Sequence, residues 1–455
     1  MPGRQIPRSF LRDARYQLTG LRSDQDGNIA VMMAFLLPIL AGGLGLGFEA
    51  SNWYLQTRAM QNAADSAAMA AAANGSSSYD IEAKAIAAQY GFVDGASNVK
   101  VAASNAATCP AGGNTCYSVT ISSVTPLYLS QVIGYQGDTV VNGANQKLLT
   151  SAAIAQQTII KQPICLLALS QSGSSLRTNG APNSNFTGCS VMSNSTATCN
   201  GSNLNANYGL AHGTNNGCGN NQQSNIPLVA DPFYALHTNI PSNTCSSYPQ
   251  ETKRGSNWSG GTSLSGLKTY SGNVQFCGDV QLTGDVVINT PDNVNGATLV
   301  IENGQLDLNG HTLSTADGSA VTIIFSGTSG SYAHYPTDTA NNGVLNIQAP
   351  SGGNFPGVAI YQDPLLTSGV NVTYSGNNPS WDITGLVYLP NADVQISGDV
   401  GQSKYGADCF VMVAGSILIN GTSNIYAQSP NGAGCQLAGL NMPSATITGR
   451  AKLVY

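Results

Sequence analysis

The stretch between residues 29 and 48, IAVMMAFLLPILAGGLGLGF, contains no charged side chain. As an α-helix it would be about 30 Å long at roughly 1.5 Å per residue, which matches the hydrocarbon core of a bilayer. Ten of its residues are Leu, Ile, Phe or Val, and together they favour insertion by about 3 to 6 kcal/mol before Pro38 and the glycines subtract from that sum. The stretch therefore predicts one transmembrane helix over residues 29–49.

Basic residues are concentrated on the N-terminal side of this stretch. Five arginines precede it, namely Arg4, Arg8, Arg12, Arg15 and Arg22. Positive charge stays on the cytoplasmic side, so residues 1–28 are expected to form a cytoplasmic arm and the rest of the chain to lie outside the cytoplasm. A cleaved secretory signal is the alternative. The length of the apolar run and the unsuitable small-residue pattern at Phe48-Glu49-Ala50 favour a retained anchor.

Glu49 follows the apolar run directly, and its carboxylate allows two interpretations. It can lie at the edge of the bilayer, where it reaches headgroup water. It can also be a carboxylate within the membrane that needs a partner, because a charge near the bilayer centre costs about 2.5 to 3.5 kcal/mol or more.

An alanine-rich segment follows, and residues 53–73 contain neither Gly nor Pro. Alanine is the best helix former, so the membrane helix is expected to continue outward as one rod and to end at Asn74-Gly75. One face of this rod carries small side chains around a methionine, and the predicted interface residues are Met60, Ala64, Ala67 and Ala71 together with Glu49. Such a face allows close helix packing. The neighbour can be this chain's own next helix, expected over 79–90, or a helix of a partner protein.

The overall composition is low in charge. Only 9% of residues are charged and the net charge is −6, while glycine alone accounts for 52 residues. An ordinary soluble domain contains about 25% charged residues, so this balance is typical of an exported β-rich protein. Nothing in it provides the positive surface that nucleic acid requires, and no nucleic-acid partner is expected.

Ten cysteines occur without a CxxC pair or a Cys/His cluster, which indicates disulfides in an oxidising compartment more than metal ligands. Free buried thiols are the alternative. The local candidates are Cys109 with Cys116, Cys189 with Cys199, and Cys409 with Cys435. Ten cysteines permit many connectivities, and the sequence does not choose among them.

From about residue 161 onward, short apolar runs alternate with Gly, Asn, Asp and Pro, as strands separated by turns do. The units GQLDLNG, ADVQISG and GSILING repeat one pattern and favour a parallel β-helix, with a β-sandwich or jelly roll as the alternative. The fold class expected is mainly β with N-terminal helices. The expected domains are the arm 1–28, the transmembrane helix 29–49, a helical stalk with a small α+β connector at 50–160, and an exported β-solenoid at 161–455.

Three segments carry a family resemblance: DGNIAVMMAFLLPIL, Glu49, and LQTRAMQNAADSAAMAAA from residue 55. Together they resemble the N-terminal signature of the TadE/TadG-like proteins of the bacterial tight-adherence (Flp) pilus system. The segment YSVTISSVTPLYLSQVIG, from residue 117, is similar to the family's next segment. A polymerising pilin would carry Glu five residues after Gly27, where this chain has Met32.

The resemblance implies a structural component of the bacterial inner membrane, with the bulk of the chain in the periplasm or at the cell surface. It would anchor or bridge the pilus machinery, and its partners would be other Tad pilus-assembly proteins and minor pilins. A surface adhesin in contact with a glycan is a further alternative, for which Tyr361, Tyr388 and Tyr405 are the aromatic candidates, although they can equally be core residues.

A polysaccharide-acting enzyme is a weaker alternative. No Arg lies between Arg254 and Arg450, and the cationic side chains in that interval are Lys268 and Lys404. The aspartates lie mostly beside Gly, Asn or Pro, where turns account for them. The four histidines show no metal-binding spacing and no G-x-S-x-G elbow occurs. We therefore predict no catalytic residue, no cofactor and no metal.

Overall fold

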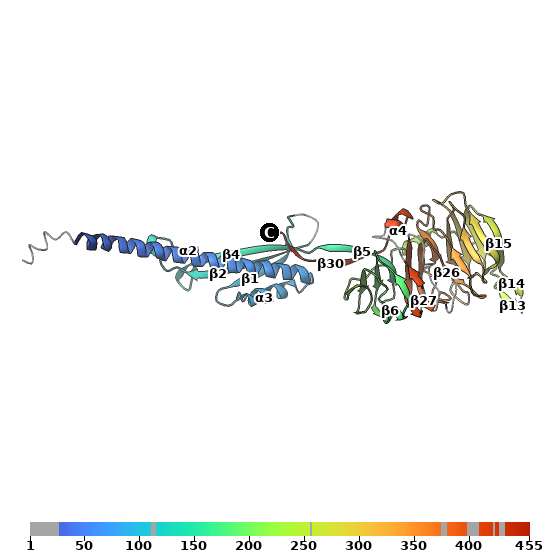
Figure 1. Ribbon diagram of the computed structural model, residues 1–455, viewed down its shortest axis with the longest axis horizontal. Helices are drawn as coiled ribbons and strands as arrows, with labels where there is room; N and C mark the ends of the chain where they lie inside the picture. The colour runs from blue at the N-terminus through green and yellow to red at the C-terminus, as the bar shows by residue number, and fades with distance from the viewer. Residues whose placement is uncertain are drawn as a thin grey trace, which may run out of the picture. The chain divides into compact units, whose positions relative to one another are not determined.

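The computed structural model describes residues 27–110, 115–254, 257–374, 380–397, 409–421, 424–426 and 433–455. Of the predicted features, residues 1–26 of the arm, Tyr405 and Lys404 lie outside these residues. The chain divides into two compact units, one made of the residues up to Ile159 together with Thr448–Tyr455, and the other of Ile160–Ile447. The fold is mainly β, with one long N-terminal helix (Figure 1).

The first unit is built on the long helix α2 (Gly27–Asn74), which ends at Gly75 with φ of 60°. The predicted rod is confirmed, since the apolar run and the alanine-rich segment form one helix with Pro38 inside it. By length and composition this helix can cross a membrane. The second helix, α3 (Tyr79–Gln89), follows after a short turn, but the Ser78 side chain makes no capping hydrogen bond.

A five-stranded antiparallel sheet packs against α2 (Figure 1). Its order is β1 (Lys100–Ala107), β2 (Cys116–Pro126), β4 (Ala144–Gln156) and β3 (Thr139–Val141), with β31 (Lys452–Leu453) also paired to β4. Buried residues alternate along β2, as expected for a sheet with one face on the core. Because β31 belongs to this sheet, Thr448–Tyr455 do not share the unit of residues 160–447, in contrast to the predicted domain 161–455.

The second unit contains two sheets of parallel strands. The larger sheet has, in spatial order, β12 (Asn221–Gln223), β10 (Tyr208–Ala211), β8 (Ser190–Ser193), β5 (Ile159–Ala168), β28 (Phe410–Gly421), β27 (Gly385–Ser397), β24 (Val358–Gln362), β21 (Val321–Ser326), β18 (Ala297–Glu302) and β16 (Gly272–Cys277). Each neighbouring pair along this path is parallel. The alternative of a β-sandwich would need mostly antiparallel pairs.

Five further strands belong to this sheet but lie off that path: β6 (Ser174–Gly180), β9 (Thr196–Cys199), β11 (Asn215–Asn216), β25 (Val372–Tyr374) and β30 (Ser444–Thr448). Of these, β6, β25 and β30 pair with the central strands β28, β27 and β5, and β9 and β11 continue from β6. The second sheet consists of β22 (Pro336–Thr337), β19 (Leu306–Asp307), β17 (Val280–Asn289), β20 (Thr312–Thr315), β23 (Val344–Asn346), β26 (Ser380–Trp381) and β15 (Thr262–Thr269). Two small pairs complete the strands, β13 (Thr252–Arg254) with β14 (Asn257–Ser259), and β29 (Asn424–Tyr426) with β7 (Asn183–Asn185).

The larger sheet buries both of its faces. Residues paired in register across the strands form apolar ladders: Leu299, Ile323, Ile360 and Val387 lie on one face, and their sequence neighbours Val300, Ile324, Tyr361 and Tyr388 lie on the other. Strands buried on both faces are continuously apolar, which accounts for the runs VTIIFS and VAIYQ.

The strand order does not follow the sequence. The chain enters the larger sheet in its middle at β5, proceeds to β12 at one end, and then crosses to β16 at the other end. It returns through β18, β21, β24 and β27 to β28, which lies beside β5. Residues 224–250, which we call the crossing segment, make this passage and contain the short 3-10 helix η2 (Tyr234–Asn239).

Candidate functional site

The carboxylate of Glu49 binds a turn that is distant in sequence. Its two oxygens accept hydrogen bonds from the backbone N–H groups of Tyr128, Leu129 and Ser130 at 2.9–3.0 Å, and from the Ser130 hydroxyl at 3.0 Å. The side chain is only 4% exposed. Four hydrogen bonds to one carboxylate offset the cost of burying its charge. Glu49 therefore has its partner within its own chain.

The turn is shaped to present these donors. The short 3-10 helix η1 (Ser130–Ile133) begins at the bound residues and ends at Gly134, which has φ of 90°. The first N–H groups of a helix have no partner within the helix, and they attract negative charge. Glu49 supplies both the acceptors and the charge. We call residues 128–133 the apolar turn, because four of its six residues are Tyr128, Leu129, Val132 and Ile133.

A glycine of α2 allows the apolar turn to come close. A side chain at Gly45 would collide with the side chain of Leu129, whereas Gly42, Gly43 and Gly47 have nothing nearby. Gly45 precedes Glu49 by four residues, about one helical turn, so both lie on the same face of α2. Contacts at these two residues fix the apolar turn against the end of the apolar run.

A cavity of about 470 Å³ lies beside Glu49, and its lining includes Leu46, Trp53, Ile133, Tyr135 and Lys147. The rings of Trp53 and Tyr135 have centroids 6.0 Å apart, and Lys147 Nζ lies 5.8 Å from the Trp53 ring. Lys147 Nζ forms a 2.7 Å ion pair with Asp138 and lies 3.1 Å from the Tyr135 hydroxyl. These acceptors, Asp138 first, raise the pKa of Lys147.

The face of α2 that carries small side chains is covered by other elements of its own chain. Met60, Ala64, Ala67 and Ala71 are fully buried in a core formed with α3, β1, β2 and β4. Polar links add to this packing: Gln61 Nε2 donates to the Ala152 carbonyl at 3.0 Å, and the Ser151 hydroxyl donates to the Thr57 carbonyl at 3.2 Å. A partner helix on this face is therefore the wrong alternative, because no surface remains there.

Five disulfides link the ten cysteines. Cys109 is bonded to Cys116 and Cys409 to Cys435. The expected pair of Cys189 and Cys199 is wrong, because Cys189 is bonded to Cys165 and Cys199 to Cys218. The remaining bond joins Cys245 of the crossing segment to Cys277 at the end of β16.

In the second unit, the crossing segment covers the face of the larger sheet that carries Tyr361 and Tyr388. Asn194 beside β8 exchanges two hydrogen bonds with Val229, at 2.8 and 3.0 Å. The Tyr388 hydroxyl of β27 donates to Asp231 at 2.7 Å, and the Tyr361 hydroxyl of β24 donates to the Phe233 carbonyl at 3.1 Å. The rings of Tyr361 and Tyr388 stack with centroids 4.6 Å apart and are fully buried. These two tyrosines are therefore core residues and not an exposed adhesive surface.

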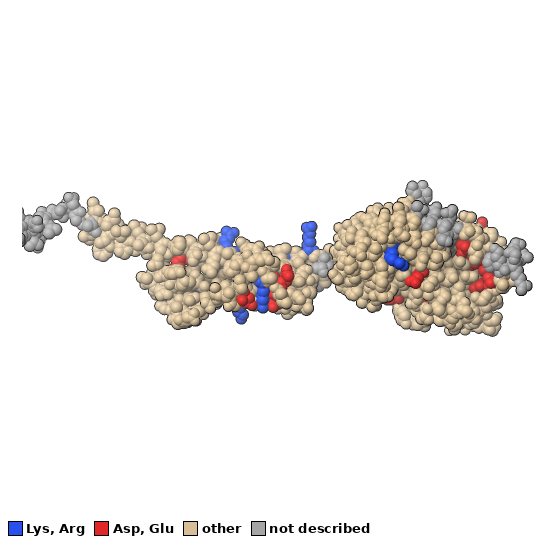
Figure 2. Space-filling view, turned by 90° about the horizontal axis from the view of Figure 1, so that it is seen from below, with Lys and Arg blue, Asp and Glu red and all other residues tan. Residues whose placement is uncertain are grey.

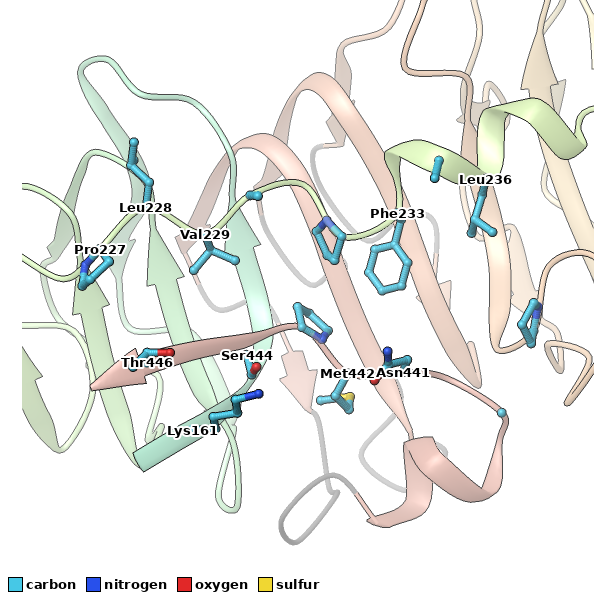
Figure 3. A pocket seen from close by; sticks show the side chains of 16 residues that line it. Lys161, Pro227, Leu228, Val229, Phe233, Leu236, Asn441, Met442, Ser444 and Thr446 are labelled. Carbon is cyan, nitrogen blue, oxygen red and sulfur yellow. The ribbon is translucent and has the colours of Figure 1, made fainter. Parts of the chain in front are cut away.

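A groove of about 600 Å³ lies between this segment and the residues around β30 (Figure 3). Figure 3 shows Val229 and Phe233 on one side and Met442 and Ser444 on the other, with the Lys161 side chain below them. Most of its lining is apolar and the cationic side chain in it is that of Lys161. No group of carboxylates or histidines meets in this lining.

Three carboxyl groups approach one another elsewhere in the second unit. Asp279 accepts hydrogen bonds from the N–H groups of Glu251 and Gln305 at 2.8 and 2.9 Å, which is a long-range role and not the turn role expected. Asp307 accepts from the N–H of Asn309 at 2.9 Å, as in an Asx turn. Burial, followed by the neighbouring Asp307 and Asp279, raises the pKa of Glu251 to about 8. Within the described ranges, no group of three or more His, Cys, Asp and Glu could hold a metal.

Residues 27–74 match the protein family described as "Putative Flp pilus-assembly TadE/G-like". The matched residues coincide with helix α2. No curated protein and no solved structure matches the chain.

Proposed function

We propose that this chain, which carries a TadE/G-like N-terminal segment, is a membrane-anchored structural component of a Tad (Flp) pilus-assembly apparatus. The observation that carries the proposal is the coincidence of the family match with α2, whose first half exposes its apolar side chains. A helix that is apolar all round and uncovered in its own fold is suited to lipid.

The proposed orientation places the N-terminus in the cytoplasm and both units outside it, in the periplasm or at the cell surface. The arginines before residue 29 support the first part, because basic residues stay on the cytoplasmic side. The five disulfides support the second part, because such bonds persist in oxidising compartments.

The proposed role of the second unit is to anchor or bridge the pilus machinery, in contact with other Tad pilus-assembly proteins and minor pilins. Its parallel strands, paired in register from β16 to β12, support a β-helix architecture in which two runs of coils meet at β5 and β28. A fold of this kind is stiff because each coil is bonded to its neighbours. It would give the machinery a rigid, weakly charged surface. On the face drawn in Figure 2, charged side chains are sparse.

Pilus assembly in the native host tests the proposal. A strain that lacks the chain should display no Flp pili, and the full chain supplied in trans should restore them. A matched version, with residues 27–48 replaced by a cleavable secretory signal, should be secreted with its disulfides and should fail to restore pili. Normal pili in the deletion strain would overturn the assembly role, and full rescue by the secreted version would overturn the need for the anchor.

A further inference from the structure

The apolar turn carries large exposed hydrophobic side chains without a cover in its own chain. Val132 is 82% exposed, Ile133 and Tyr128 are each 68% exposed, and Leu129 is 40% exposed. Exposed apolar side chains gathered in so short a stretch mark a surface that contacts another apolar phase. The turn is also held in place, since Glu49 binds three of its backbone N–H groups and its Ser130 hydroxyl.

The position of the turn along α2 identifies that phase. Leu129 packs at Gly45, three residues before the end of the apolar run at Phe48. At 1.5 Å per residue this is about 4.5 Å inside the end of a segment that fills the hydrocarbon core. The exposed apolar surface of α2, which includes Leu44 and Phe48, is therefore continuous with that of the turn.

The residues beyond the turn follow the polarity gradient of a bilayer. Trp53 lies five residues past Phe48, about 7.5 Å further along the helix, and its ring contacts that of Tyr135. Tryptophan and tyrosine are enriched at this level, where headgroups begin. The Trp53 indole nitrogen itself is buried, so the ring meets this level through its apolar edge and its contact with Tyr135. The ion pair of Lys147 and Asp138 lies beside these rings.

We propose that the apolar turn is immersed in the bilayer interface at the C-terminal end of the apolar run, so that the chain contacts lipid through two elements and not one. Glu49 acts as the clip that joins the two. A helix with a second, rigidly attached contact cannot rotate or slide freely in the bilayer, so the turn sets the depth and the rotation of the anchor. This inference rests on the membrane anchoring proposed above.

Fluorescence quenching tests the inference on the full chain, inserted at low protein-to-lipid ratio into vesicles of phosphatidylcholine and phosphatidylglycerol. In Val132→Trp, the added fluorescence relative to the parent should be quenched about twofold or more by lipids brominated near the carbonyl end of the acyl chain. Lipids brominated near the methyl end should quench it less. The matched control is Ile81→Trp, at a residue that is 71% exposed in the same unit.

Ile81 lies far from the proposed level of the bilayer interface. Helix α3 follows the end of α2, and Ser66 donates to the Tyr90 hydroxyl at the C-terminal end of α3. Residue 81 therefore lies beside the part of α2 beyond Ser66, roughly 27 Å or more past Phe48. Fluorescence added at Ile81 should not be quenched.

The outcomes separate the inference from the proposed anchoring. Equal quenching at residues 132 and 81, in a chain that resists alkaline extraction from the vesicles, would overturn the inference alone. A chain that alkali extracts would overturn both the inference and the anchoring. Quenching at residue 132 that disappears as the protein-to-lipid ratio rises would show a second copy covering the turn, and would also overturn lipid as its normal neighbour. Glu49→Gln should reduce the quenching in Val132→Trp, because the turn loses its clip.

Discussion

The two units bury apolar side chains in different ways. In the first unit the core face of α2 consists of Met60 and small alanines, so the helix backbone comes close to α3 and to the sheet. In the second unit, Val, Ile, Leu and Tyr side chains stack in ladders along parallel strands and fill two cores with their bulk. The first core therefore depends on close approach, and the second depends on volume.

The units also differ in what they leave exposed. In the first unit, large exposed hydrophobic residues follow one another on α2 up to Phe48 and on the apolar turn, while others, such as Ile81 and Val140, are spread along the sequence. In the described part of the second unit, such residues are spread along the sequence, at Leu228, Leu267, Val294 and Leu365 among others. Isolated exposed hydrophobic residues are normal on protein surfaces, whereas a continuous apolar surface needs a partner. The comparison shows that, among the described residues, the continuous apolar surface belongs to the first unit, which is where the proposed contact with lipid lies.

The largest effect is expected from truncating a bulky residue in the core of the second unit. A small effect would contradict the statement that this core depends on side-chain volume. Phe233 packs edge-on against Tyr388 at 6.0 Å, and its carbonyl accepts the Tyr361 hydroxyl. Phe233→Ala should cost about 3 to 4 kcal/mol, because a large cavity forms under the crossing segment. Hydrogen exchange should accelerate in peptides from β24 and β27 and stay unchanged in α2. The half-exposed neighbour provides the control Tyr234→Ala, which should cost less than 1 kcal/mol, and equal effects of the two variants would contradict the prediction.

The opposite change is expected to damage the first core. Ala67 is fully buried where α2 packs on its own chain. Ala67→Leu should destabilise the first unit by about 2 to 3 kcal/mol, because added volume forces the backbones apart. Exchange should accelerate in α3 and β4 and stay unchanged in the second unit. Met69→Leu introduces the same side chain on the exposed side of the helix, at a residue 40% exposed, and should be near neutral. A tolerated Ala67→Leu would show that close approach is not what stabilises this core.

Glu49→Gln should have a smaller and more local effect. The amide keeps one acceptor oxygen but turns an NH₂ group toward backbone donors, so charge-assisted hydrogen bonds are lost, at a cost of about 2 kcal/mol. Exchange of the N–H groups of Tyr128, Leu129 and Ser130 should accelerate, with the core of the first unit protected as before. Glu82→Gln, on the exposed side of α3, is the matched control. Unchanged exchange at residues 128–130 would show that the carboxylate does not hold the turn.

Local features of this fold could be predicted from the sequence, and long-range ones could not. The continuity of α2 follows from the absence of Gly and Pro over residues 53–73, a property of neighbouring residues. The partners of Glu49 lie about 80 residues away and are backbone N–H groups, which have no sequence signature. A signal for the apolar turn was present, since the segment YSVTISSVTPLYLSQVIG leaves its last apolar residues outside the alternating strand pattern.

The disulfides and the strand order show the same limit. Cys165 and Cys189 are joined near β5 and β8, which are parallel neighbours, so residues 24 positions apart meet. Proximity in sequence suggested Cys189 and Cys199 instead. The crossing from β12 to β16 could not be read from the sequence, because the apolar pattern of a strand is the same at either end of a sheet. The stacking of Tyr361 and Tyr388 could have been found, because VAIYQ and LVYLP place a tyrosine at matching positions of two buried strands.

The smallest effect is expected on the pH dependence of stability, from a half-buried carboxyl group in the second unit. It sharpens the comparison because the stability of the first unit should not change when this group is replaced. Glu251 has its pKa raised to about 8 by burial and by the nearby Asp307 and Asp279, whereas in the unfolded chain it ionises near its ordinary value of 4.5. Unfolding therefore releases a proton between these two pH values. The contribution of Glu251 to stability is fully present below pH 4.5, falls as pH rises toward 8, and is then constant.

Glu251→Gln removes this titration while keeping the shape of the side chain. Because Glu251 is half-buried and solvent screens its charge, the variant should be more stable than the parent by only on the order of 1 to 2 kcal/mol at pH 8, and about equal to it near pH 4. The measurement is the free energy of unfolding of the second unit across that range, from hydrogen exchange of β17 and β19 with the exchange rates corrected for pH. Asp317→Asn, at an exposed residue, should leave the pH dependence of the parent unchanged. A difference in stability between Glu251→Gln and the parent that stayed constant from pH 4 to pH 8 would contradict the prediction. It would show that the Glu251 carboxyl is not protonated in the folded chain at neutral pH.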